Sequence, residues 1–195
     1  MNGADRGMTI NGFAAALRKR IEREVPRADV GKEADFERRH VIEPAWELAQ
    51  LYPEIQVVVH PPAQKTRCKD RCDVVPVEFS RRVTGCSKCW SASKQWSVVE
   101  AFGTRHTFDL VARDREGGTL ALEVKWLSLE SGRGPNGEFQ RFVGQCALAT
   151  ARHAVVIGVC GFRGRRTKAF DAHEGNLKKA LERIGIVLIP LHTKT

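Results

Sequence analysis

The sequence has no long run of apolar residues. Its longest purely apolar run, Ala154 to Cys160, is far shorter than the roughly 18 residues that a membrane-spanning helix needs. The opening segment, MNGADRGMTI, also lacks the basic stretch followed by an apolar core that marks a secretory signal. We therefore expect a cytoplasmic protein that has no membrane partner.

Negative charge is scarce as well. The 195 residues include 23 acidic side chains against 32 lysines and arginines, which gives a net charge of +9. Such a surplus favours a polyanionic partner, and nucleic acid is the simplest one. The surplus is concentrated in residues 61–100 and 161–168, where solvated surface charge is the alternative explanation. The predicted contacts with a nucleic-acid backbone are Arg163, Arg165, Arg166, Lys168, Arg81 and Arg82.

Helical periodicity opens the chain. Apolar residues recur at every fourth position from Phe13 and predict a helix over residues 11–25. A second helix is predicted over residues 31–51, and it carries Glu33 and Glu37 on the face that also holds its apolar residues. Pro44 is expected to kink this helix or to restart it as a first-turn residue.

The rest of the chain alternates strand and helix patterns. Hydrophobic composition of 42% and a charged fraction of 28% are typical of a folded domain and exclude a disordered chain. The order of elements predicts an α/β fold with a mixed sheet. We expect strands at residues 55–60, 106–113, 119–127, 154–162 and 186–191, and helices at 138–153 and 172–185.

A hairpin is predicted around the loop at residues 114–118. In the register that this loop sets, Asp109 lies directly opposite Glu123. The alternation of side chains then separates an apolar face from a charged one. The apolar face is expected to hold Phe108, Leu110, Ala112, Leu120, Leu122, Val124 and Trp126, and the charged face Asp109, Glu123 and Lys125.

The charged face of this hairpin is expected to need a cation. Two facing carboxylates about 5 Å apart repel each other, and a divalent metal or Lys125 would relieve the repulsion. Oxygen ligands with open coordination positions suit Mg²⁺, and an ammonium beside them would offset charge that builds up on a phosphate. An ordinary exposed face is the alternative, but charges seldom interrupt a core strand such as ALEVKWL without a purpose.

Residues 108–126, FDLVARD and LALEVKW with the loop between them, resemble the core motif of the PD-(D/E)XK, or restriction endonuclease-like, nuclease superfamily. The resemblance implies a three-layer α/β/α sandwich with a central mixed sheet. With it the chain divides into an N-terminal helical extension (1–30) and a nuclease core (31–195). The core is interrupted by a small insertion (63–97), which the cysteine spacing described below predicts to bind zinc. The resemblance also implies that Mg²⁺ or Mn²⁺ is held by Asp109, Glu123 and the backbone carbonyl of Val124, and that Lys125 takes part in catalysis.

Two further segments are similar to parts of this family. KEADFERRHVIEP, residues 32–44, resembles the acidic first helix, in which a Glu completes the metal site; Glu33 fits that place best, with Glu37 as its rival. GQCALA resembles the helix that follows the catalytic strand and maps its Gln onto Gln145. The sequence departs from the family pattern in having Phe108 where many members have Pro, and in lacking a Tyr after the Gln.

Four of the six cysteines, Cys68, Cys72, Cys86 and Cys89, form two close pairs. In a cytosolic chain this spacing favours a tetrahedral, structural Zn²⁺ site. An Fe–S cluster, and free or disulfide-bonded cysteines, are the alternatives. Cys146 and Cys160 fall in apolar elements and are predicted to be core residues.

The features together predict a metal-dependent endonuclease that hydrolyses DNA phosphodiester bonds in restriction, defence or repair. The alternative is a catalytically inactive, zinc-containing nucleic-acid-binding module on the same fold. RNA as the substrate stays open. A homodimer is the simplest arrangement for cutting two strands.

Overall fold

The computed structural model describes residues 7–23, 32–59, 96–101, 103–129, 136–164 and 168–193. Several predicted positions lie outside these ranges: the cysteines Cys68, Cys72, Cys86 and Cys89, and the basic residues Arg81, Arg82, Arg165 and Arg166. Lys168 is described in its backbone alone. In the described part of the chain, no helix is long and apolar enough to cross a membrane.

A five-stranded mixed sheet forms the centre of the molecule, in the order β1-β4-β5-β6-β7. β4 pairs antiparallel with both β1 and β5, whereas β5, β6 and β7 run parallel to one another. The predicted α/β class with a mixed sheet is therefore confirmed. The strands are β1 (Gln56–Val59), β4 (Leu110–Arg113), β5 (Thr119–Ser128), β6 (Val155–Arg163) and β7 (Ile186–His192).

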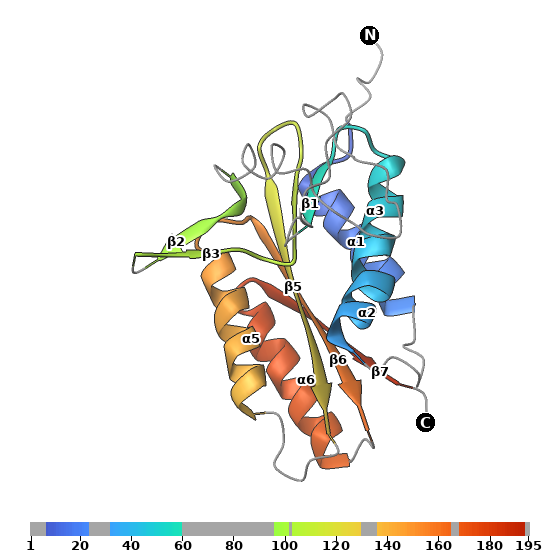
Figure 1. Cartoon of the computed structure of the whole chain (residues 1–195), viewed down its shortest axis with the longest axis vertical. Coiled ribbons are helices and arrows are strands. Elements are labelled where there is room, and N and C mark those ends of the chain that lie inside the picture. Colours follow the sequence, from blue (N-terminus) through green and yellow to red (C-terminus); the bar gives the residue numbers. More distant parts are fainter. Residues whose placement is uncertain are drawn as a thin grey trace.

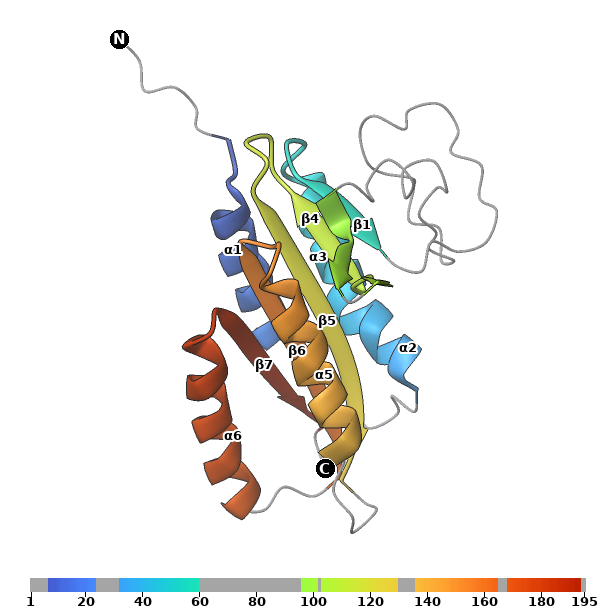
Figure 2. The ribbon, with the colours of Figure 1, turned by 90° about the vertical axis from the view of Figure 1, so that its left-hand side faces the viewer.

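Helices cover both faces of this sheet (Figures 1 and 2). On one face lie α1 (Ile10–Arg23), α2 (Glu33–Glu37) and α3 (Glu43–Gln50), and on the other α5 (Asn136–Ala149) and α6 (Lys168–Glu182). Each face has its own apolar core. Phe13, Leu17 and Ile21, from the stripe predicted for the first helix, are fully buried in the first core, so α1 is one of the layers of the fold. Val25, the last residue of that stripe, lies outside the described residues.

The second predicted helix contains a π-helical turn shortly before its proline. A π-helical turn, η1 (Arg38–Ile42), joins α2 to α3, and Pro44 lies in the first turn of α3. Proline has no N–H to donate to the preceding turn, and at a helix start that donor is unneeded. The predicted first-turn position of Pro44 is confirmed.

The β4–β5 hairpin has the predicted register, from Leu110 opposite Leu122 to Arg113 opposite Thr119. Asp114 closes the loop, because its carboxylate accepts hydrogen bonds from the N–H of Gly118 at 2.7 Å and from that of Ile10 at 2.8 Å. The second bond ties the start of α1 to the hairpin.

The prediction for residues 106–109 was wrong. The chain bends at Asp109, one residue before the paired ladder begins, and Phe108 packs into the core on the α5 side rather than with Leu110. His106 belongs to a separate two-stranded sheet, β2 (Val99–Ala101) with β3 (Thr104–His106). A hairpin turn with Gly103 at φ 72° joins these two strands, a backbone angle that glycine adopts without strain.

Candidate active site

The site is built on an edge of β5 that β4 leaves open. β4 pairs with β5 only as far as Leu122, whereas β6 pairs with the opposite edge of β5 as far as Ser128. The N–H of Val124 at the open edge donates to Asp109 Oδ2 at 2.7 Å, and the N–H of Trp126 donates to Glu33 Oε2 at 3.1 Å. Because the N–H and C=O of one strand residue point to the same edge, the carbonyl of Val124 also faces this site.

Glu123 and Lys125 project from β5 toward the side of α5, as the strand alternation predicts. Glu123 is only 6% exposed, and its Oε2 has no hydrogen-bond partner among the described residues. Lys125 is partly buried, and its Nζ lies 2.9 Å from Glu33 Oε2. A buried carboxylate oxygen without a partner is unfavourable, and a cation at this place would satisfy it.

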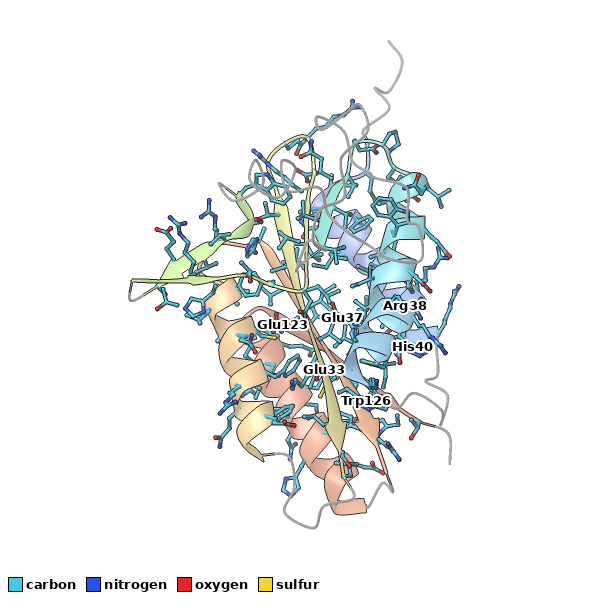
Figure 3. The ribbon with its side chains drawn as sticks, viewed as in Figure 1. Glu33, Glu37, Arg38, His40, Glu123 and Trp126 are labelled. Atoms are coloured by element: carbon cyan, nitrogen blue, oxygen red, sulfur yellow. The ribbon has the colours of Figure 1, made fainter. Side chains whose placement is uncertain are left out.

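Helix α2 brings two more carboxylates to the open edge. Glu33 and Glu37 are four residues apart and therefore share one side of the helix. Figure 3 shows both between α2 and β5, with Glu123 beside them. Phe36, fully buried on the same helix, packs against the ring of Trp126 with 4.7 Å between centroids and so fixes α2 on β5.

Burial and mutual repulsion raise the pKa values of three of these carboxyl groups. For Glu123 burial, then the charge of Asp109, raises the pKa to about 9. Burial raises the pKa of Asp109 to about 6, although the hydrogen bond from Val124 opposes this shift. Burial together with Asp109 and Glu33 raises the pKa of Glu37 to about 8. Burial lowers the pKa of Lys125, but the hydrogen bond and charge of Glu33 outweigh it, so the net direction is upward.

The donor set fits a hard divalent cation. Asp109, Glu123 and the Val124 carbonyl supply oxygen atoms, which Mg²⁺ and Mn²⁺ prefer, and the orphaned Glu123 Oε2 is one of them. Among the described side chains, no three His, Cys, Asp or Glu residues are grouped closely enough to hold a metal ion. Since Asp109 Oδ2 and both Glu33 oxygens face nitrogen donors, binding a metal through these groups requires the carboxylates to turn.

The other predicted residues whose side chains the structure describes belong to α5 and β6. Gln145 is half-buried on α5, and its catalytic role stays a prediction. Arg163, at the end of β6, is exposed and lies in register with Ser128. Cys146 and Cys160 are buried, as predicted for core residues. Burial, and then the charges of Glu123 and Asp109, raise the pKa of the Cys146 thiol.

Two features of the site had no signal in the sequence pattern. One is the use of the Trp126 backbone N–H, which depends on where β4 ends and not on the type of residue. The other is Gly161, across from Trp126 on β6: a methyl group there would come within 2.2 Å of the Trp126 ring and 2.6 Å of Phe36. Only a glycine leaves room for this aromatic pair.

Comparison of the chain with protein-family models, with curated proteins and with solved structures finds no match. The case for a function therefore depends on the residues and the geometry described above.

Proposed function

We propose that the protein is a metal-dependent nuclease of the restriction endonuclease-like fold, which hydrolyses DNA phosphodiester bonds in the cytoplasm. The observation that carries the proposal is the meeting of Asp109, Glu123 and Lys125 at the open edge of β5, together with the acidic helix α2. The element order supports the fold: an antiparallel β1-β4-β5 meander followed by a helix and a parallel strand.

Each residue of the site has its own role in the proposed hydrolysis. Asp109, Glu123 and the carbonyl of Val124 would hold Mg²⁺ or Mn²⁺, which supplies Lewis-acid activation of a water and neutralises phosphate charge. Asp109 is kept in place by the N–H of Val124. Lys125 presents a cation beside the carboxylates, where it orients the attacking water and stabilises negative charge on the phosphate.

Basic residues close to the same end of the sheet would hold the DNA. Arg163 lies opposite Ser128, three residues beyond Lys125 along β5, a separation of about 10 Å at the rise of a strand. We assign the phosphate contacts to six basic residues: Arg163, Arg165, Arg166, Lys168, Arg81 and Arg82. Cys68, Cys72, Cys86 and Cys89 are proposed to hold a structural Zn²⁺.

The test is incubation of the purified protein with supercoiled plasmid and with single-stranded DNA. Each substrate is tried with Mg²⁺, with Mn²⁺ and with a chelator. The chelator experiment is repeated with Zn²⁺ added back and with neither Mg²⁺ nor Mn²⁺ present. Cleavage that requires Mg²⁺ or Mn²⁺ and disappears in Lys125→Ala or Asp109→Ala supports the proposal. Lys179→Ala is the matched control, because Lys179 is exposed on α6.

The same experiment separates the alternative function. Full cleavage by purified Lys125→Ala or Asp109→Ala overturns the site assignment. Salt-sensitive DNA binding without cleavage under any metal condition favours an inactive binding module on this fold.

A further inference from the structure

Three short contacts fix the carboxylate of Glu33. Lys125 Nζ donates to Glu33 Oε1 at 3.1 Å and lies 2.9 Å from Oε2, and the N–H of Trp126 donates to Oε2 at 3.1 Å. Both oxygens of Glu33 thus face nitrogen donors, and the donors come from consecutive residues of β5. An oxygen already engaged in this way is poorly placed to ligate a metal.

The backbone position of Glu33 is set by the packing of Phe36 on the same helix. Phe36, less than one helical turn further on, is fully buried between the rings of Trp126 and His40. The backbone of α2 is therefore anchored to the strand whose lysine it holds. Both Glu33 and Glu37 interact with the charge of Asp109, but the ion pair with Lys125 is made by Glu33.

Lys125 needs a partner of this kind. Its ammonium group sits on a flexible four-carbon chain, and Asp109 and Glu123 are both close enough to interact with it. A lysine that swung onto either one would neutralise a carboxylate that the proposed metal requires. The ion pair with Glu33 keeps the ammonium at the open edge of β5 instead.

We propose that Glu33 is a positioning residue that holds the Lys125 ammonium at the active site and that it is not a ligand of the catalytic metal. The role of Lys125 rests on the proposed nuclease function. Holding the ammonium in advance removes the need to order it during the reaction, which is how a fixed catalytic group accelerates a reaction.

Glu33→Gln tests this role, because the amide oxygen can still accept the hydrogen bond from the Trp126 N–H but has no charge to pair with Lys125. We expect a fall in kcat of about 10 to 100-fold with little change in KM. Mn²⁺ binding, counted by electron paramagnetic resonance without DNA, should match the wild type. Glu33→Asp, which restores the charge, should recover part of kcat. Acetylation of Lys125, followed by mass spectrometry against exposed Lys179, should become faster in Glu33→Gln as the amine is released.

Two results would overturn the inference. One is loss of Mn²⁺ binding in Glu33→Gln with normal binding in Glu37→Gln, since Glu33 would then be a ligand. The other is an unchanged rate of Lys125 acetylation. A wild-type protein that neither binds Mn²⁺ nor cuts DNA would refute the proposed function, while the acetylation rate would still decide whether Glu33 holds Lys125.

Discussion

Burial favours the protonated, neutral form of the Glu123 carboxyl in the folded protein. The unfolded chain ionises this carboxyl near its ordinary pKa of 4.5, whereas burial and Asp109 raise the pKa to about 9 in the folded protein. The folded state therefore keeps a proton that the unfolded state has lost. The contribution of Glu123 to stability is fully present below about pH 4.5 and is lost as the pH rises toward 9.

We predict that Glu123→Gln stabilises the protein when no Mg²⁺ or Mn²⁺ is added. Glutamine has the same shape and cannot ionise, so the free energy of unfolding at pH 7.5 should rise by on the order of 2 kcal/mol, and by less at pH 5. Urea unfolding at the two pH values measures this difference. Glu116→Gln, in the exposed turn between β4 and β5, should show neither gain. A destabilised Glu123→Gln protein at pH 7.5 would contradict the argument.

His153 gives the molecule a pH dependence of the opposite sign. It is 5% exposed, packs edge-on against Phe108, and neither ring nitrogen has a hydrogen-bond partner among the described residues. Burial, with a smaller effect of Arg152, lowers its pKa from 6.5 to about 4. The unfolded chain therefore takes up a proton first as the pH falls, and stability is lost between about pH 6.5 and 4.

The variant His153→Leu should remove this acid sensitivity. Between pH 7 and pH 5 the wild type should lose about 2 kcal/mol more unfolding free energy than the variant. Chemical denaturation at both pH values, with exposed His173→Gln as the control, provides the comparison. Equal losses in wild type and His153→Leu would show that His153 is not the group responsible.

At the scale of secondary-structure elements, the contact between α2 and the sheet depends on one glycine of β6. A methyl group on Gly161 would approach the rings of Trp126 and Phe36 to 2.2 and 2.6 Å, distances that real contacts do not allow. Phe36 lies between Glu33 and Glu37 on α2. Moving its ring therefore moves the helix that carries both carboxylates.

We predict that Gly161→Ala weakens both the fold and the site. Overpacking of this kind costs about 1 to 3 kcal/mol of stability, and metal-dependent cleavage should fall along with it. Gly144→Ala on α5 is the matched control, because nothing lies within 4 Å of the added methyl group. Alanine is the better helix former, so this control should keep its activity and gain some stability. Thermal unfolding and plasmid cleavage of the two variants test the pair.

The hairpin shows how far a sequence pattern can reach. The five-residue loop determined the register, because it places Arg113 opposite Thr119. In this register Leu110 and Leu122 share one apolar core. The bend at Asp109 and the small β2–β3 sheet broke the predicted alternation of side chains without a local signal. They depend on the packing of Phe108 in the apolar core on the α5 side of the sheet. That packing is a tertiary contact, which the local sequence does not encode.

The site was predictable to a similar extent. Asp109, Glu123 and Lys125 could be grouped because local pairing relates them. Glu33 and Glu37 were expected near them only through a resemblance, since they are more than 70 residues from Asp109 in the chain. The contacts that Glu33 and Glu37 make depend on how Phe36 packs α2 against Trp126. The periodicity of α2 carries no information about that packing.

At the scale of the whole molecule, the net charge is positive whereas the site is rich in carboxylates. The net charge of +9 attracts a polyanion, while the carboxylates at the open edge of β5 would repel a phosphate unless a cation lay between them. DNA binding should therefore depend on basic residues at the same end of the sheet as the site. Arg163 is at that end, whereas Arg183, which precedes the parallel strand β7, is at the other.

This arrangement predicts which arginines set the salt dependence of DNA binding. Measured in the Lys125→Ala background, to prevent cleavage, removal of Arg163 should weaken binding to any DNA sequence alike. The slope of log K against log salt should flatten by about 0.9 for each phosphate that the protein no longer neutralises. Arg183→Ala carries the same change in net charge, so it separates a local interaction from the general attraction of a basic surface. If both variants bind DNA equally weakly, the charge of the whole molecule, and not a basic surface beside the active site, holds the DNA.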